Sequence, residues 1–545
     1  MRRQESWVQR VGLGLAVAAL FFAAAEGLLR LNGFRYAPPV KVLEVPTVAD
    51  YIGTYEHYWP THLTPPGYVW RTEPNTKITD AHGFRRPGVA DRKDPAKMRI
   101  AFLGGSTTQG GYPAYPERTI RLLNEAAGRQ RFEHLNAACS SYSTHQSLLA
   151  LQRWVLPLKP DVLLVYHGWN DGYLQSDGYS DREKDPLAGD AALAASSALT
   201  WLRQWRLTQA LGWLVRRLDR TWPRPRVGER AFAENLRHIA EICRREGVPL
   251  VLLTRPATRL RPLPALDEMS LTAYERLLGT RDRAAIYTRL HARQNAVIRR
   301  IAAAYEHVSL ADASAFLDDI QARQRKGAYG DHITIFQRDA CHLGDFANQL
   351  LAEFLARELS ARFAPELEAG ISARINSPTY ALALAAEFNA ALRPWEALYQ
   401  ARKAQTRSTD PEIQARGAAL AEEAAANMEF ATLFYEGRWG GSAPDFESKI
   451  EKLRRCQQLR PTDLGVCLQI FRVCLYVDQL PVAAAAMNLF QPNTLAARYE
   501  WLEFVLLSHM AGERHQAAAR AAAELLRLNP EHQGARDILD RVRPY

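Results

Sequence analysis

The sequence contains a series of short apolar runs, each followed by turn residues or by a stretch of helical pattern. Strands buried on both faces of a parallel sheet consist of nearly continuous apolar residues, and helical crossovers connect them. The sequence therefore predicts an α/β domain over residues 98–365, with helices on both faces of a parallel sheet. The predicted strands are residues 99–103, 132–136, 162–166, 249–254 and 308–310.

A glycine pair and a serine follow the first predicted strand directly, as Gly104-Gly105-Ser106. Small residues allow a sharp turn that presents the serine hydroxyl at the carboxyl edge of the sheet, where ligands bind in open α/β folds. A helix that begins there directs backbone N–H groups toward a developing oxyanion. We therefore predict that Ser106 is a nucleophile. A second Gly-Gly-Ser, at residues 440–442, follows no predicted strand, and we interpret it as a chance match.

Two further motifs place polar side chains near the same edge. Asn170 follows the third predicted strand and can donate a side-chain N–H to an oxyanion. Asp339 lies three residues before His342, close enough to accept the imidazole Nδ1–H. This bond would fix the tautomer and leave Nε2 to take the serine proton. The sequence thus predicts a catalytic triad of Ser106, Asp339 and His342.

These motifs and their order resemble the SGNH, or GDSL-type, hydrolase superfamily over roughly residues 80–360. The resemblance implies a three-layer α/β/α, flavodoxin-like sheet and an acyl-serine mechanism, and no cofactor is expected. The segment Gly83-Phe84-Arg85 resembles the lead-in of membrane-anchored members. The oxyanion donors implied are Ser106, Ser141 and Asn170, supported by Gly105, Gly168 and Asp171.

Ser141 is the one departure from the pattern, because the family has a glycine at this position. Its backbone N–H is kept, but a serine costs more than a glycine if φ is positive there. Removing one oxyanion donor lowers the rate by roughly 10²–10³, so an enzyme would remain even without this contact. The α/β-hydrolase fold is disfavoured, because the serine motif lacks the closing glycine of G-x-S-x-G.

The chain begins with arginines and an apolar run at residues 11–25. If Glu26 and Arg30 lie at the interface, the run reaches the ~20 residues that a spanning helix needs. The small residues 23–25 fit a signal-peptide cleavage site instead. We predict that residues 1–35 are an inner-membrane anchor with the catalytic domain in the periplasm. The alternatives are secretion after cleavage, or a helix buried in the soluble fold.

Residues 36–97 are rich in proline, aromatic and polar residues, and we expect an irregular lead-in. An insertion at about 175–230 separates the third and fourth predicted strands. An amphipathic helix there would contact the membrane surface or cover the site. The alternative is a surface helix that packs its tryptophans on the domain. The insertion carries Trp201, Trp205, Trp213 and Trp222 among arginines.

Residues 370–545 are rich in alanine and leucine, and we predict an all-α domain. Pro461 and Pro530 each follow an amphipathic helix and lie 69 residues apart, close to two periods of a 34-residue repeat. Pro492, between them, gives uneven spacings. The pattern resembles tetratricopeptide repeats, with a general helical bundle as the alternative. Such repeats would bind a protein partner.

Composition excludes several other classes of protein. The formal charge is +10, but no concentrated basic run or recognition module is present, so we expect no nucleic-acid partner. Six cysteines show no CxxC spacing, and no HExxH occurs, so we expect no metal site. Cys139 and Cys341 fall in loops near the predicted pocket. A disulfide or a thiol nucleophile is conceivable there, but small semi-buried residues are the simpler interpretation.

The leading hypothesis is therefore a serine esterase that hydrolyses acyl esters, acetyl esters included, of envelope polysaccharide or lipid. In a close variant, a sugar hydroxyl replaces water and the enzyme is an acyltransferase. The competing hypothesis is a membrane-tethered scaffold with a degenerate site and a protein partner on its helical repeats.

Overall fold

The computed structural model separates the chain into two compact units, which are described one at a time. The first unit comprises Met1–Val42, Thr61–Ala322 and Ile335–Glu358, and the second comprises Leu43–Pro60, Arg323–Thr334 and Leu359–Tyr545. The residues described are 7–34, 61–63, 70–72, 79–86, 88–110, 114–175, 180–184, 205–219, 223–257, 268–337, 341–437, 446–460 and 515–528, with separate positions between 463 and 539. The predicted domain limits of 98–365 and 370–545 stay predictions.

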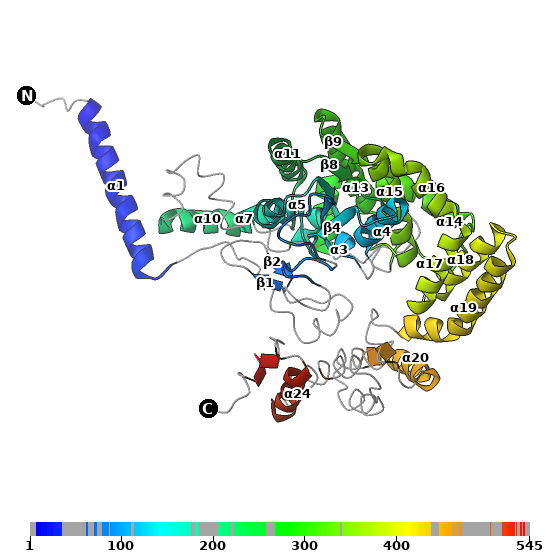
Figure 1. Ribbon diagram of the computed structural model, residues 1–545. Coiled ribbons are helices and arrows are strands. Elements are labelled where there is room, and N and C mark those ends of the chain that lie inside the picture. The colour runs from blue at the N-terminus through cyan, green and yellow to red at the C-terminus, as the bar shows by residue number, and fades with distance from the viewer. Residues whose placement is uncertain are drawn as a thin grey trace, which may run out of the picture. The chain divides into compact units, whose positions relative to one another are not determined.

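A five-stranded sheet forms the centre of the first unit (Figure 1). Its order is β4-β3-β5-β8-β9, and all neighbouring strands are parallel. Each predicted strand is present, with ends that agree with the prediction or differ from it by one residue. The chain moves to one side of β3 to form β4 and to the other side to form β5, so the strand order reverses between β3 and β5. The strands are β3 (Met98–Gly104), β4 (Phe132–Asn136), β5 (Val162–Tyr166), β8 (Leu250–Leu253) and β9 (Val308–Ala311).

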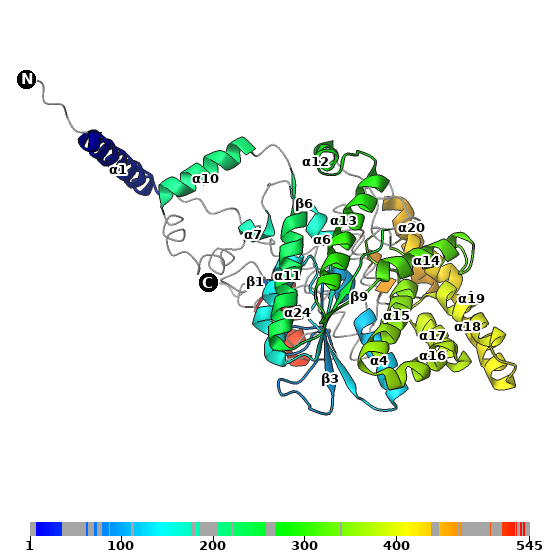
Figure 2. The same cartoon turned by 90° about the horizontal axis from the view of Figure 1, so that it is seen from above.

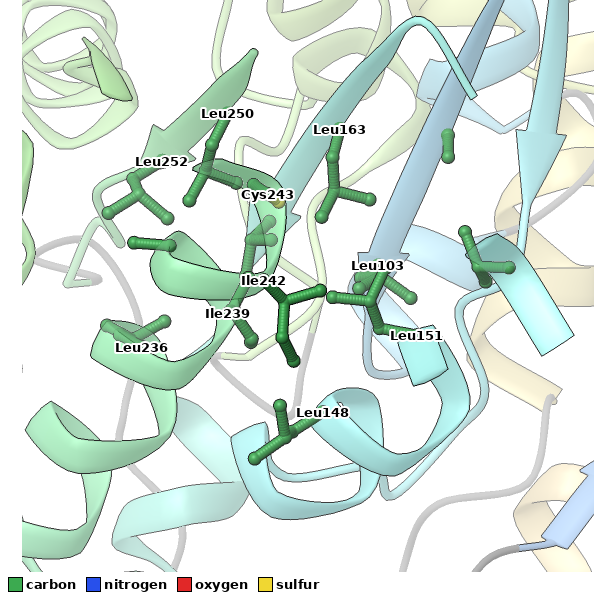
Figure 3. Close-up of a cluster of buried hydrophobic side chains, with 14 of the residues drawn as sticks. Leu103, Leu148, Leu151, Leu163, Leu236, Ile239, Ile242, Cys243, Leu250 and Leu252 are labelled. Atoms are coloured by element: carbon green, nitrogen blue, oxygen red, sulfur yellow. The ribbon is translucent and has the colours of Figure 1, made fainter. Parts of the chain in front are cut away.

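Successive side chains of β3 face two different helical layers. Leu103 packs into an apolar cluster that includes Leu151 and Ile239 (Figure 3). Phe102 instead meets the ring of Tyr115 at a centroid distance of 6.1 Å. Because neighbouring side chains of a strand point to opposite faces, these contacts place helices on both sides of the sheet. The three-layer α/β/α arrangement is confirmed.

The two layers consist of helices that connect the strands, together with α15, which follows the last strand. On the side of Leu103 lie α5 (Thr144–Ala150), η1 (Leu151–Val155), α11 (Glu229–Glu246) and α13 (Arg283–Ala304). On the side of Phe102 lies α4 (Tyr115–Ala127), which contacts α15 (Asp345–Phe363) through a hydrogen bond from Arg118 to Gln349. Figure 2 shows α11 and α4 on opposite sides of β3.

The lead-in contains regular structure that its composition did not predict. Strands β1 (Thr61–Leu63) and β2 (Trp70–Thr72) form an antiparallel pair within the predicted irregular lead-in, whose limits of 36–97 stay a prediction. Cross-strand backbone hydrogen bonds stabilise such a pair even where the side chains show no clear alternation. Further along, Arg85 pairs with Asn136 at the carboxyl end of β4.

The N-terminal helix α1 (Trp7–Leu31) contains a segment, Gly12–Leu31, that is long and apolar enough to cross a membrane. Near its end, Glu26 accepts hydrogen bonds from Arg30 Nε at 2.7 Å and from the backbone N–H of Leu207 at 2.8 Å. A carboxylate at this position caps a helix N-terminus and interacts favourably with its dipole.

The helix that Glu26 caps is α10 (Arg206–Asp219), which lies within the predicted insertion. Its described face exposes Leu211 and Leu214. At the base of the insertion, β6 (Leu174–Gln175) pairs with β7 (Arg224–Pro225). Contact of α10 with a membrane or with the site stays a prediction, and Trp201 and Trp222 lie outside the described residues.

The second unit is helical wherever the structure describes its regular elements, which confirms the all-α prediction. Helix α20 ends at Leu459 and α24 ends at Leu528, each two residues before a predicted proline break. The tetratricopeptide repeat itself stays a prediction, and Pro461 and Pro492 lie outside the described residues. The helices are α16 (Glu368–Asn376), α17 (Pro378–Ala390), α18 (Pro394–Thr406), α19 (Pro411–Gly437), α20 (Phe446–Leu459) and α24 (His515–Leu528).

Candidate active site

The carboxyl ends of β3 and β5 meet where the strand order reverses, and Gly104 pairs there with Tyr166. Ser106 begins α3 (Ser106–Gln109) directly after β3. Asn170 lies in α6 (Trp169–Gly172) after β5. The structure therefore brings these two predicted residues into one pocket. The pocket is lined by Gly105, Ser106, Thr107, Tyr166, His167, Gly168, Trp169, Asn170, Arg255 and Cys341.

Gly105 is required by the close approach of the next loop. A Cβ atom at this position would lie 2.7 Å from Asn170 Nδ2 and 3.3 Å from the carbonyl oxygen of Tyr142. Asn170 Nδ2 donates to that same carbonyl oxygen at 2.9 Å. A side-chain amide carries two N–H donors, and the other has no acceptor recorded among the described residues. One N–H thus fixes the amide, and donation by the second to an oxyanion stays a prediction.

Gly168 is constrained in two ways. Its φ is +137°, a conformation that side chains rarely adopt. A Cβ atom would also lie 2.8 Å from Gln294 Oε1, because Gln294 Nε2 donates to the Gly168 carbonyl oxygen at 2.7 Å. This bond ties the turn that carries Asn170 to helix α13.

Ser141 has a φ of +60°, so the conformation that makes glycine favourable is present although the glycine is not. A residue other than glycine in this region costs on the order of 1 kcal/mol or more. The side chain of Ser141 is exposed, whereas its carbonyl oxygen accepts a 2.6 Å hydrogen bond from Arg226 Nη1. The bond from Arg226 therefore fixes the carbonyl side of this turn, and with it the position of the Ser141 N–H that the predicted oxyanion hole would use.

Arg226 was not predicted from the sequence, since no local motif surrounds it. It is buried and forms an ion pair with Asp181 at 2.9 Å, and its Nη2 donates to Gln146 Oε1 at 2.9 Å. Asp181 also accepts a hydrogen bond from Ser143 Oγ at 2.6 Å. Two residues beyond Ser141, the chain is thus held by the same network. Arg226 follows β7, so the oxyanion turn is fixed to the base of the insertion.

Asp171 and His167 lie in the protein interior. Asp171 accepts hydrogen bonds from Thr144 N at 2.9 Å and Thr144 Oγ1 at 2.5 Å, and His167 Nε2 lies 2.7 Å from Ser147 Oγ. Burial raises the pKa of Asp171 to about 6, although the bonds from Thr144 oppose this. Burial also lowers the pKa of His167 to about 3, so this imidazole is neutral. A supporting role for Asp171 stays a prediction.

His342 lies on a loop that reaches the pocket through its neighbour, Cys341. The loop is closed by a bridge between Phe336 and Leu343 and by a 2.7 Å bond from the Gln337 N–H to the His342 carbonyl oxygen. His342 is half-buried. Asp339 lies outside the described residues, so its pairing with His342 and their joint action on Ser106 stay predictions.

The sequence left open a disulfide between Cys139 and Cys341. Cys139 and Cys341 are both buried thiols and form no disulfide, so the disulfide alternative is wrong.

Among the residues that the structure describes, no group of three or more His, Cys, Asp or Glu side chains could hold a metal ion. The second Gly-Gly-Ser, at 440–442, lies outside the described residues.

The parallel sheet between two helical layers, with a pocket at its carboxyl edge, is the arrangement of an SGNH-type hydrolase domain. A helical region follows this domain in the sequence. Residues 102–350 match the model of the GDSL-like Lipase/Acylhydrolase family. The chain is accordingly an ester-hydrolysing enzyme of the GDSL type. No curated protein sequence matches it.

Several solved structures of lipases and esterases are similar to about half of this chain. The lipase/acylhydrolase from Enterococcus faecalis is 19% identical, with 49% of this chain and 96% of that chain covered and a TM-score of 0.29. An acetyl xylan esterase is 16% identical, with 49% and 100% covered and a TM-score of 0.30. An acetylxylan esterase from Geobacillus stearothermophilus is 13% identical, with 49% and 96% covered and a TM-score of 0.30.

We expect Arg226→Met to lower kcat about tenfold or more, with KM changed much less. The Ser141 turn would lose its anchor, so its N–H would no longer be held in place for the oxyanion contact that the sequence predicts. A fully lost oxyanion donor lowers the rate by roughly 10²–10³. Steady-state kinetics on an acetate ester measure the effect. Arg230→Met, which removes an exposed arginine on α11, is the matched control. An equal loss in both variants, or a change confined to KM, would contradict the role of Arg226 in holding the Ser141 turn for catalysis.

The raised pKa of Asp171 predicts that the free energy of unfolding depends on pH. This pKa is raised to about 6 in the folded protein, so between about pH 4 and pH 6 the folded chain holds a proton that the unfolded chain has lost. The stability it contributes is present near pH 4 and falls as pH rises to about 6, by on the order of 3 kcal/mol. Denaturant unfolding across this window should show that Asp171→Asn removes the decline. Asp319→Asn, at an exposed position, should leave it unchanged.

Proposed function

We propose that Ser106 attacks the carbonyl carbon of an acyl ester and forms an acyl-serine that water then releases. His342 takes the serine proton and returns it to the leaving alcohol, while Asp339 orients the imidazole. The oxyanion accepts hydrogen bonds from the N–H groups of Ser106 and Ser141 and from Asn170. The observation that supports this most is the bond from Asn170 Nδ2 to the Tyr142 carbonyl oxygen, which fixes an amide donor beside Gly105 and Ser106.

The alcohol that receives or carries the acyl group is proposed to be a sugar hydroxyl of envelope polysaccharide. With a sugar hydroxyl in place of water, the same acyl-serine would make the enzyme an O-acyltransferase, so both reactions use one site. An uncleaved α1 would hold the domain on the periplasmic side of the inner membrane. This proposal is supported by the length and apolar composition of Gly12–Leu31 and by the hydrogen bond of Glu26 to α10.

We expect Ser106→Ala to lower hydrolysis of 4-nitrophenyl acetate by the full chain in detergent by at least about 10³-fold, because no other group replaces the nucleophile. Ser442→Ala alters the other Gly-Gly-Ser and should retain full activity. Equal rates for Ser106→Ala and the unaltered protein would show that the chain acts as a scaffold or uses another nucleophile. Adding an acetylated oligosaccharide and an unmodified acceptor separates hydrolysis from transfer, since only transfer yields a newly acylated acceptor.

Large side chains, Tyr166, Trp169 and Arg255 among them, line the pocket around Ser106 and leave little free space in it. We therefore expect a preference for short acyl groups over long lipid chains. The value of kcat/KM for 4-nitrophenyl acetate should exceed that for the dodecanoate by about 100-fold, with both substrates kept below the micellar concentration. Faster turnover of the dodecanoate would instead indicate a lipid substrate.

A further inference from the structure

Arg255 is a pocket residue that the proposed mechanism does not use. It follows β8 after one residue, is 3% exposed, and lines the same pocket as Ser106. Its Nη2 lies 3.3 Å from the carbonyl oxygen and 3.1 Å from the sulfur of Cys341. The centre of the guanidinium lies 5.0 Å from the ring centroid of Trp169. These contacts hold the group in place, but none of them carries a full negative charge.

Two of the other buried arginines are each neutralised by a carboxylate. Arg99 lies 2.7 Å from the carboxylate of Glu133, and Arg226 lies 2.9 Å from that of Asp181. Among the described residues no carboxylate lies within ion-pair distance of Arg255, and its buried Nε has no hydrogen-bond partner. An uncompensated charge is expensive to bury, so an anion that enters the pocket would be bound favourably.

The groups around Arg255 do not offset its charge. Burial lowers the pKa of His167 to about 3 and that of His291 well below its ordinary range, and the positive charge of Arg255 adds to both shifts. Burial raises the pKa of Tyr166 to about 12, so its phenol is also neutral. Among the described residues that line the pocket, Arg255 is therefore the one charged side chain at neutral pH.

The backbone at Arg255 is fixed before any substrate arrives. Its N–H donates to Asn295 Oδ1 at 2.8 Å, and its carbonyl oxygen accepts from Asn295 Nδ2 at 2.8 Å. A paired bond of this kind, together with the aromatic face of Trp169, limits the movement of the side chain. Little ordering is then required on binding, which favours affinity.

We propose that Arg255 forms an anionic subsite, which binds a carboxylate or phosphate group carried by the substrate close to the ester that is cleaved. The proposal rests on the esterase function proposed above and narrows its substrates to acidic esters. The guanidinium fits such groups because its N–H donors match the geometry of carboxylate and phosphate oxygens. Since the pocket is small, the charge must lie near the scissile carbonyl, on either the acyl group or the alcohol.

The test compares charged and neutral esters of the same shape with the full chain in detergent. 4-Acetoxybenzoate and 4-acetoxybenzamide place the difference on the alcohol. 4-Nitrophenyl hydrogen succinate and its methyl ester place it on the acyl group. Rates measured with Ser106→Ala are subtracted, because the succinate hydrolyses spontaneously. The unaltered enzyme should prefer the charged member of one pair, and that pair identifies the source of the anion.

Replacing Arg255 by methionine should lower kcat/KM for the preferred charged ester by roughly 10- to 100-fold, as expected for a hydrogen bond to a charged group. The neutral ester of the same pair should change less than about threefold, and Arg255→Lys should retain part of the preference. Arg299→Met, which removes an exposed arginine paired with Asp312, is the matched control. An equal loss for both esters would overturn the proposal, and so would the absence of any preference in the unaltered enzyme.

A binding measurement separates this proposal from the esterase function. Calorimetric titration of Ser106→Ala with benzoate should show binding that weakens at least about tenfold when Arg255→Met is added, whereas benzamide should bind poorly to both. Binding without any hydrolysis dependent on Ser106 would overturn the esterase function and leave the anionic subsite. Hydrolysis that depends on Ser106, without dependence on Arg255 in either measurement, would leave the esterase and overturn the subsite.

Discussion

The hydrogen bond from Asn170 Nδ2 to the Tyr142 carbonyl oxygen is the interaction on which the arrangement of this pocket depends. It joins the loops after β4 and β5 across the end of β3, where the strand order reverses. The bond lies so close to Gly105 that a side chain at that position would collide with it. The turn before Ser106, the amide of Asn170 and the turn at Ser141 are thereby fixed relative to one another, without help from substrate.

Buried polar networks behind the pocket keep these loops in place. Arg226 and Asp181 hold the Ser141 turn, and Asp171 holds the start of α5 through Thr144. In the first network the charges of Arg226 and Asp181 form an ion pair, and in the second Asp171 accepts hydrogen bonds from Thr144. Buried charged groups require such partners, because burial removes them from water. Arg255 differs because its charge faces the pocket without a carboxylate among the described residues. The contrast separates arginines that support the fold from one that is suited to bind a ligand.

Much of the fold and part of the site could be predicted from local sequence. The five strands were predicted because buried parallel strands are short apolar runs, such as Val162–Tyr166. Ser106 and Asn170 were placed correctly in one pocket because the carboxyl ends of parallel strands share one edge. The β1–β2 pair was missed, because its stability comes from hydrogen bonds between two segments rather than from a periodic pattern in either.

By itself, the sequence determined the order of strands and helices, the apolar N-terminal helix, the helical second unit and the residues at two strand ends. Apolar periodicity and turn residues act over a few positions, so they can be read locally. The hydrogen bond from Arg226 to Ser141, the positive φ of Ser141 and the place of Arg255 in the same pocket as Ser106 could be known only from the folded chain. The members of the two pairs lie 85 and 149 positions apart in the sequence, and what they do depends on burial and on the partners that folding brings together.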